Sequence, residues 1–257
     1  MRAKLRDLLL SSCTNGKIRG WLEAWGYDVV PRRARDPAEP LHNHLTEVFS
    51  ALKINCVLDV GANKGQYALR LRRYGYTGHV ISFEPVRANF EILNRNCGQD
   101  ALWRGLDFAL GSTDCSSEIQ VTQQSVFSSF LHPNAFSKSR FREGSSVIST
   151  ETVTIRRLDS IIDDLTNGIE QPRIFLKMDT QGFDLEVLRG AEGSLDKILG
   201  LQTEISIMPI YEQMPSHIEM LSELQGRQYV VTGMFPINPD ELLRPVEFDC
   251  IAVRADR

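Results

Sequence analysis

A glycine turn flanked by two acidic residues is the part of this chain best suited to chemistry. Residues 57–67 read Val-Leu-Asp-Val-Gly-Ala-Asn-Lys-Gly-Gln-Tyr, which is typical of a buried strand, a tight turn and the start of a helix. Glu84 ends the next predicted strand, about 25 residues after Asp59. A glycine turn lets a ligand approach the bare backbone, and an acid ending the neighbouring strand can accept both hydroxyls of a ribose. The pattern therefore predicts a nucleoside site.

The spacing of the glycines separates two kinds of nucleoside ligand. A dinucleotide turn reads G-x-G-x-x-G, whereas this chain has Gly61 and Gly65 with Asn63 and Lys64 between them. S-adenosylmethionine (SAM) has no pyrophosphate and carries a zwitterionic amino acid and a sulfonium, which polar side chains around the turn suit. We therefore predict SAM as the ligand, with Asp59 helping to hold its ammonium end. A phosphate-binding or purely structural turn is the alternative.

A second motif adds carboxylates at strand ends. Residues 175–191 contain a predicted strand, the turn Asp179-Thr180-Gln181-Gly182 and a helix, and Glu204 ends the strand that follows. Because ligands bind outside the carboxyl ends of the strands in such sheets, Asp59, Glu84, Asp179 and Glu204 should meet at one cleft. Acids at several successive strand ends indicate function, whereas a single one would be typical of a helix cap.

Three residues are candidates for catalysis if the methyl acceptor is a hydroxyl group, because its proton must be removed. Asp179 and Glu204 fit either a general base or a pair of oxygen ligands for a divalent cation. The alternative for Asp179 is that it only orders its own turn. His132 lies in a predicted insertion from which it could reach an acceptor, and a surface position is its alternative.

Alternating strand and helix patterns from Leu41 onward predict a parallel sheet that is covered on both faces. The predicted strands of this sheet are residues 56–60, 79–83, 101–110, 174–178, 201–205, 228–232 and 247–253. The alternation breaks between residues 111 and 155, where residues 119–122, 126–131 and 152–155 predict short strands. Such an insertion beside a nucleotide corner is a suitable place for acceptor contacts.

Composition narrows the partners and the location. The 257 residues are 42% hydrophobic, which suits one α/β domain, and the net charge of −4 argues against nucleic acid held through its phosphates. The five cysteines are scattered and form no CxxC pair, which indicates the reducing cytoplasm rather than a structural zinc site. No apolar run approaches the ~20 residues of a transmembrane segment.

Residues 1–40 are predicted to be an N-terminal helical appendage with two short helices and a proline-containing linker, before a main domain at residues 41–257. Trp21, Leu22 and Trp25 share one face of the second helix. Packing on the main domain is one interpretation of this apolar face. A lid, an oligomer contact or a peripheral membrane contact are the others.

The two motifs resemble those of the FkbM family of SAM-dependent methyltransferases. The resemblance covers roughly residues 41–253 and is strongest at residues 58–65, at Phe83-Glu84-Pro85, and at residues 177–182 and 188–191. It implies a class I SAM-dependent methyltransferase (Rossmann-like) fold, an α/β architecture with about seven mostly parallel strands flanked by helices, the last strand antiparallel, and a short β insertion. It also implies methyl transfer to a hydroxyl of a sugar, glycolipid or related natural product.

The resemblance also implies a set of cofactor-binding residues. The methionine end of SAM would be lined by Asp59, Gly61, Ala62, Asn63, Gly65 and Tyr67. Glu84, followed by Pro85, would take the ribose, Asp107 would face the adenine, and Gln181 of the second motif would complete the site. Many members of the family have Glu in place of Gln181, which weakens any role for this position as a base or metal ligand.

Two other functions stay open at this point. The first is a NAD-dependent reductase on a Rossmann-like sheet, against which the glycine spacing argues. The second is a non-catalytic SAM-binding partner subunit, against which the intact second motif argues.

Overall fold

The computed structural model describes Trp25 and residues 39–237, 239 and 242–256. The chain divides into two units after Pro40, and nearly all described residues belong to the second unit, residues 41–257. The two helices predicted within residues 1–40, with Trp21 and Leu22, lie outside the described residues. Within the described ranges, no helix combines the length and the apolar character that crossing a membrane requires.

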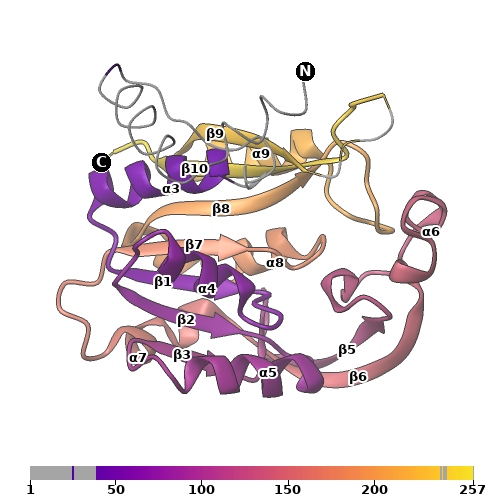
Figure 1. Ribbon diagram of the computed structural model, residues 1–257, viewed down its shortest axis with the longest axis horizontal. Coiled ribbons are helices and arrows are strands. Elements are labelled where there is room, and N and C mark those ends of the chain that lie inside the picture. The colour runs from indigo at the N-terminus through magenta and orange to yellow at the C-terminus, as the bar shows by residue number, and fades with distance from the viewer. Residues whose placement is uncertain (1–24, 26–38, 238, 240–241, 257) are drawn as a thin grey trace, which may run out of the picture. The chain divides into compact units, whose positions relative to one another are not determined.

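A seven-stranded sheet forms the centre of the second unit (Figure 1), with the strand order β3-β2-β1-β7-β8-β10-β9. In this order the strands are β3 (Trp103–Leu106), β2 (His79–Phe83), β1 (Cys56–Val60), β7 (Ile174–Met178), β8 (Ile198–Ser206), β10 (Glu247–Arg254) and β9 (Tyr229–Ile237). Strand β10 runs antiparallel to both of its neighbours, while the other pairs are parallel. The reversed last strand is as predicted.

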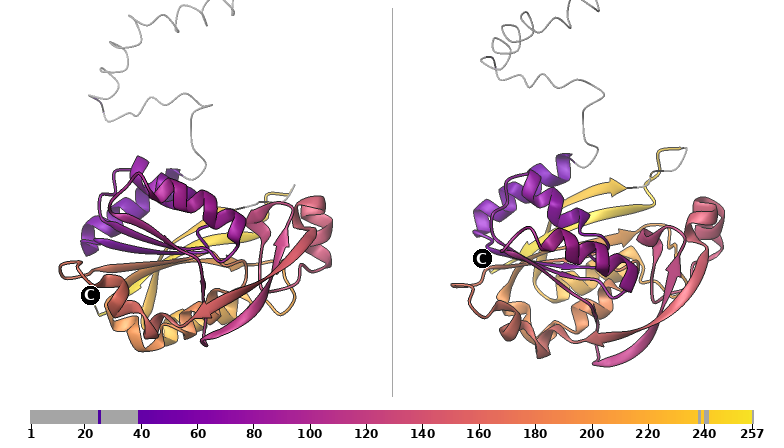
Figure 2. Two further views of the ribbon diagram at one scale, coloured as in Figure 1. Left: turned by 90° about the horizontal axis from the view of Figure 1, so that it is seen from below. Right: turned by 60° about the horizontal axis from the view of Figure 1, so that its bottom comes forward.

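Helices cover both faces of this sheet (Figure 2). One face packs against α3 (Glu39–Leu52), α4 (Gln66–Arg73) and α5 (Arg87–Cys97). The other face packs against α7 (Ile162–Thr166), α8 (Asp184–Arg189), the 3₁₀ helix η4 (Glu192–Lys197) and α9 (His217–Gly226). Successive side chains of a strand point to opposite faces, so Val57 joins the first core while Leu58 and Val60 join the second.

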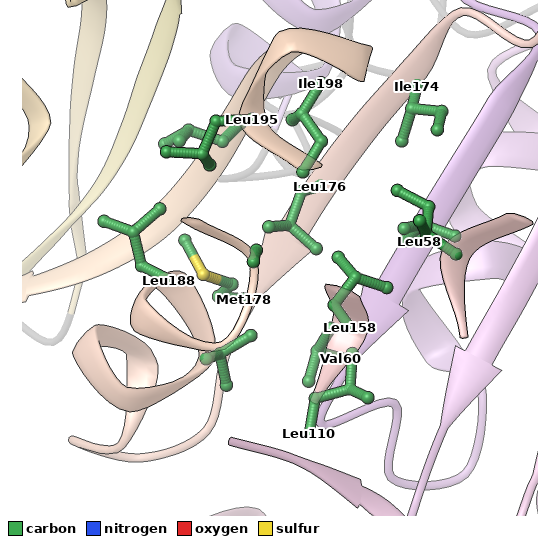
Figure 3. Close-up of a cluster of buried hydrophobic side chains, with 14 of the residues drawn as sticks. Leu58, Val60, Leu110, Leu158, Ile174, Leu176, Met178, Leu188, Leu195 and Ile198 are labelled. Carbon is green, nitrogen blue, oxygen red and sulfur yellow. The ribbon is translucent and has the colours of Figure 1, made fainter. Parts of the chain in front are cut away.

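The second core positions the site (Figure 3). Leu58 and Val60 of β1 lie with Leu176 and Met178 of β7 and with Leu188 of α8, and all five are buried. Val60 pairs with Met178 in the parallel register, so β1 and β7 end at the same level of the sheet. The turns that follow these two strands therefore leave the sheet side by side.

The predicted insertion forms a second sheet of three strands, in the order β4-β6-β5. Its elements in chain order are β4 (Ala109–Leu110), β5 (Cys115–Thr122), η1 (Ser125–Phe127), α6 (Ala135–Phe141), η2 (Arg142–Ser145) and β6 (Val147–Arg156), and η3 (Leu158–Ser160) follows. Figure 1 shows β5, β6 and α6 on the side toward which the arrowheads of β1, β2 and β7 point. The insertion thus stands at the carboxyl ends of the parallel strands.

Two of the predicted strands are wrong. Residues 101–110 do not form one strand, because β2 ends at Phe83, opposite Leu106, and leaves β3 no neighbour beyond that point. The chain then joins the second sheet as β4, which pairs with β6. Residues 126–131 form no strand and make a single bridge through Ser129 to Gln120, because η1 interrupts the extended chain.

Candidate active site

The turn after β1 requires glycine at position 61. Gly61 has a φ of 73°, and a Cβ there would lie 2.0 Å from the carbonyl oxygen of Asp179. Its backbone N–H and that of Ala62 both donate to the carbonyl of Phe83. The turns after β1, β2 and β7 therefore meet at one point, and any side chain larger than hydrogen would drive them apart.

Glu84, at the end of β2, is held in place by backbone donors. The backbone N–H of Asn63 donates to Glu84 Oε2 (2.8 Å), and that of Val86 donates to Oε1 (2.9 Å). Burial raises the pKa of Glu84 to about 7, although these hydrogen bonds favour its ionised form. Asn89 Nδ2 also donates to Oε1, at a long 3.4 Å, whereas Oε2 keeps its second lone pair, so Glu84 can still accept hydrogen bonds from a ligand.

A cavity of about 440 Å³ opens between these turns and the insertion, within the size range of small-molecule sites. Two groups of residues line it. Those from the main sheet and its turns include Gly61, Asn63, Phe83, Glu84, Pro85, Asp179, Gln181, Glu204 and Glu247. Those from the second sheet and its connections include Ala109, Leu110, Ile119, Ser125, Val126, Phe127 and Phe130. The insertion therefore supplies one wall of the cavity.

Lys177 is buried, does not line the cavity and joins two of the predicted acids. Its Nζ is 3.0 Å from Asp59 Oδ1 and 3.3 Å from Asp179 Oδ2. Burial disfavours the charged ammonium, but Asp59 and Asp179 outweigh this cost and raise the pKa of Lys177. Lys177 is therefore charged, and it compensates the fully buried carboxylate of Asp59.

The side chain of Gln181 bridges Asp179 and Glu204. Its Nε2 lies 3.0 Å from Asp179 Oδ1 and 2.9 Å from Glu204 Oε2, so each amide hydrogen can donate to one carboxylate. Burial raises the pKa of Glu204 well above its ordinary value, and the charges of Asp179 and Glu247 add to this effect. A carboxylate with a raised pKa is a stronger base than an ordinary glutamate, so this wall can receive a proton.

Asp184 holds the turn that carries Gln181, and sequence reasoning missed it. It is 2% exposed, and its Oδ1 accepts from the backbone N–H of Thr180 (2.8 Å). Its Oδ2 accepts from Thr203 Oγ1 (2.6 Å) and from the backbone N–H of Glu204 (3.2 Å). Asp184 thus ties the turn after β7 to the end of β8, a role that its position at the start of α8 did not reveal.

Sequence reasoning missed the contacts that attach the insertion to the main sheet, of which two lie beside the site. Ser125 Oγ lies 3.2 Å from both polar atoms of the Asn63 side chain. The hydroxyl of Tyr211, in the segment after β8, lies 3.0 Å from the carbonyl oxygen of Phe127. No local pattern could have found these pairs, because their partners are far apart in the sequence.

The predicted cofactor residues fall into two groups. Gly61, Asn63, Glu84, Pro85 and Gln181 line the cavity. The others support it from behind or lie outside its wall, and they are Asp59, Ala62, Gly65, Tyr67 and Asp107. Tyr67 is buried, donates to Gln202 Oε1 (2.9 Å) and has Lys177 Nζ 5.1 Å from its ring centre. Asp107 is exposed, between β3 and β4.

Of the predicted catalytic residues, Asp179 and Glu204 line the cavity together, whereas His132 does not. His132 is exposed, and its carbonyl accepts from the backbone N–H of Glu212. The structure therefore places the two carboxylates together and leaves the histidine outside.

Among the described residues, no group of three His, Cys, Asp or Glu side chains is placed to hold a metal ion. Asp179 and Glu204, the pair predicted for a divalent cation, are joined by the amide nitrogen of Gln181. That nitrogen donates hydrogen bonds and has no lone pair for a cation, so this arrangement does not fit a calcium or magnesium site.

The strand order, the reversed last strand and the cavity at the carboxyl ends of the strands define a class I SAM-dependent methyltransferase fold of the Rossmann-like type. A family model described as the methyltransferase FkbM domain matches residues 59–231, and the chain belongs to this family. The predicted family is thereby confirmed. Membership of a methyltransferase family decides against the NAD-dependent reductase.

Three known proteins show how far the similarity reaches. Methyltransferase sdnD of Sordaria araneosa is 23% identical over 158 residues, which are 53% of this chain and 60% of that protein. Methyltransferase FkbM from Methylobacillus flagellatus KT shares 18% identity at a TM-score of 0.49, over 78% of this chain and 43% of its own. An rRNA methylase from Streptococcus thermophilus shares 12% identity at a TM-score of 0.44, over 86% of this chain and 98% of its own. The chain spans less than two thirds of the length of the first two proteins.

Proposed function

We propose that this protein transfers a methyl group from SAM to a hydroxyl group of a sugar, a glycolipid or a related natural product. The observation that supports this most directly is the composition of the cavity wall. It combines a glycine turn and a buried acid suited to an adenosyl ligand, Gly61 and Glu84, with a carboxylate pair suited to a hydroxyl group, Asp179 and Glu204.

On the donor side, Glu84 would accept hydrogen bonds from the ribose hydroxyls, and the bare backbone at Gly61 would let the amino-acid end approach. Asn63 and Gln181 offer polar groups at the same wall. When bound, SAM supplies an electrophilic methyl group on a positively charged sulfur. The carboxylates of this wall favour a positively charged ligand over a phosphate-bearing one.

On the acceptor side, we assign Glu204 as the general base. Its raised pKa makes it a better proton acceptor than an exposed carboxylate, and it lines the cavity. Asp179 is held by Lys177 and Gln181, so it can accept a hydrogen bond from the acceptor and orient it. Holding the reacting oxygen in line with the methyl group is itself worth roughly 7–11 kcal/mol in well-oriented pairs.

The cavity wall also indicates the chemistry of the acceptor. Its described residues include no Lys, Arg or His, so nothing there would neutralise a phosphate or carboxylate on the acceptor. The insertion contributes apolar side chains, among them Ile119, Val126, Phe127 and Phe130. A neutral hydroxyl on a partly apolar framework, as in a glycolipid or a modified sugar, fits this wall.

The proposal is tested by incubation with methyl-labelled SAM and a panel of neutral sugars, glycolipids and polyketide-derived alcohols. We expect the labelled methyl group to be bonded to an oxygen of the acceptor, as a methyl ether. In Glu204→Gln, kcat should be lower by a factor of about 10²–10⁴, and the affinity for S-adenosylhomocysteine (SAH) should be unchanged. The exposed Glu118→Gln is the matched control. Transfer to amines alone would reassign the acceptor, and absence of SAH binding would refute the proposal.

SAH binding without turnover on any acceptor class would instead support the non-catalytic partner subunit.

We also propose that the protein acts in the cytoplasm, because its cysteines are scattered, and the four described ones, Cys56, Cys97, Cys115 and Cys250, are free. Cell fractionation with an antibody against the native chain tests this location.

A further inference from the structure

A buried tyrosine stands behind the carboxylate pair. Tyr211 is 2% exposed and packs with Ile210, Val246, Leu131 and Met214. It does not line the cavity, so it cannot touch the reacting groups. Its hydroxyl reaches back toward the site and lies 2.9 Å from an atom of the bridging glutamine, Gln181 Oε1.

The position of Gln181 is over-determined. Its φ of 55° is in the left-handed region, which is unfavourable for a residue with a side chain. Ser129 Oγ donates to its carbonyl oxygen (2.7 Å), and its side-chain amide contacts Tyr211, Asp179 and Glu204. A strained backbone conformation that four hydrogen bonds hold in place indicates that the position of this side chain is important for function.

The orientation of the Gln181 amide has a physical cause. A carboxylate paired with an ammonium, as Asp179 is with Lys177, can only accept further hydrogen bonds, so it requires the amide nitrogen on its side. A rotated amide would place Oε1 against Asp179 and Glu204, which repels both. The hydroxyl of Tyr211 can donate to Oε1 only when the nitrogen faces the carboxylates, so it favours that orientation whenever its hydrogen is on Oε1.

Tyr211 also contacts the carbonyl oxygen of Phe127, a residue in the cavity wall that the insertion supplies. A phenol has one hydrogen, so it can donate fully either to Phe127 O or to Gln181 Oε1. The hydroxyl of Tyr211 therefore connects the insertion, at Phe127, with Gln181, which bridges the two carboxylates.

We propose that Tyr211 is a positioning residue for methyl transfer, and that it acts by fixing the Gln181 amide so that both amide hydrogens point at Asp179 and Glu204. The proposal rests on the proposed function and adds a residue outside the cavity to it. Among the described residues, the Gln181 amide is the hydrogen-bond donor to the side chain of Glu204, so a rotated amide would leave Glu204 without this donor. The charged and titratable groups that act on it are Asp179, Lys177, Asp184, Glu247, Asp249 and Tyr211.

The test removes one oxygen atom. Tyr211→Phe keeps the packing of the ring and should lower kcat by about tenfold, with the affinity for SAH unchanged. Tyr229→Phe is the matched control, because this buried hydroxyl donates to Ile198 O (2.9 Å) and lies outside the cavity wall. Its kcat should equal that of the unmodified protein.

A double-mutant cycle with Gln181→Leu decides whether Tyr211 acts through Gln181. The double variant should lose no more kcat than Gln181→Leu alone, since a residue that acts through another shows non-additive effects. Independent, additive losses would overturn the proposal, as would an unchanged kcat in Tyr211→Phe or an equal loss in Tyr229→Phe.

A readout without turnover separates this proposal from the proposed function. The side-chain amide of Gln181 can be followed by ¹H–¹⁵N NMR, and its two hydrogens should shift in Tyr211→Phe and stay unchanged in Tyr229→Phe. If no acceptor is methylated, the proposed function fails while this measurement still decides the positioning. If the Gln181 amide signals do not shift when the Tyr211 hydroxyl is removed, the positioning role of Tyr211 is refuted.

Discussion

Protonation of Glu84 should control the binding of adenosyl ligands near neutral pH. Burial raises the pKa of Glu84 to about 7, and only the ionised form can accept hydrogen bonds from both ribose hydroxyls. The ionised fraction would be about one tenth at pH 6 and about nine tenths at pH 8. The affinity for SAH should therefore rise by about tenfold over this range.

The assay is isothermal titration calorimetry with SAH at several pH values. Glu84→Gln should bind more weakly, because an amide nitrogen would face one of two backbone donors, and its affinity should vary little between pH 6 and pH 8. Glu91→Gln, on the exposed surface of α5, is the control and should keep the rise. Equal pH dependence in Glu84→Gln and in the unmodified protein would refute the reasoning.

The same shift has a consequence for stability without ligand. The folded state binds the proton of Glu84 more tightly than the unfolded state does, so Glu84 stabilises the fold at low pH. This contribution is lost as the pH rises from about 4.5 to about 7, and amounts to about 3 kcal/mol at most. Urea unfolding of the unmodified protein and of Glu84→Gln should diverge across this window, and parallel curves would contradict the assignment.

Three further substitutions test separate parts of the structure. Gly61→Ala should abolish SAH binding and destabilise the fold. The control is Gly75→Ala, because Gly75 is also in the left-handed region (φ 90°) but has nothing within 4 Å of its Cβ, so it should cost only about 1 kcal/mol in urea unfolding. Equal costs of the two substitutions would disprove the contact between Gly61 and Asp179. Lys177→Met should cost about 3–5 kcal/mol, because it leaves buried charge unpaired, and a loss under 1 kcal/mol would deny the ion pair. Asp107→Asn should leave the SAH affinity within about twofold, and a larger loss in calorimetry would restore the adenine contact.

The strands nearest the site were predictable because their signals are local. Residues 56–60, 79–83 and 174–178 are apolar runs that end in an acid or a glycine turn, and β1, β2 and β7 have these bounds. A strand buried on both faces needs a continuous apolar run whatever its neighbours are. The second sheet was harder, because its strands are half exposed and its pairing depends on partners distant in the sequence, as the split of residues 101–110 shows.

The amino-acid sequence by itself determined which strand ends carry acids, and the parallel order then implied that Glu84, Asp179 and Glu204 share one cleft. Only the tertiary structure decided what each acid contacts. In the folded chain, Asp59 forms a buried ion pair with Lys177, Gln181 bridges Asp179 and Glu204, and His132 lies outside the cavity wall. The physical reason is that charge state and orientation depend on burial and on hydrogen-bond partners, and these are set by residues that the fold alone brings together.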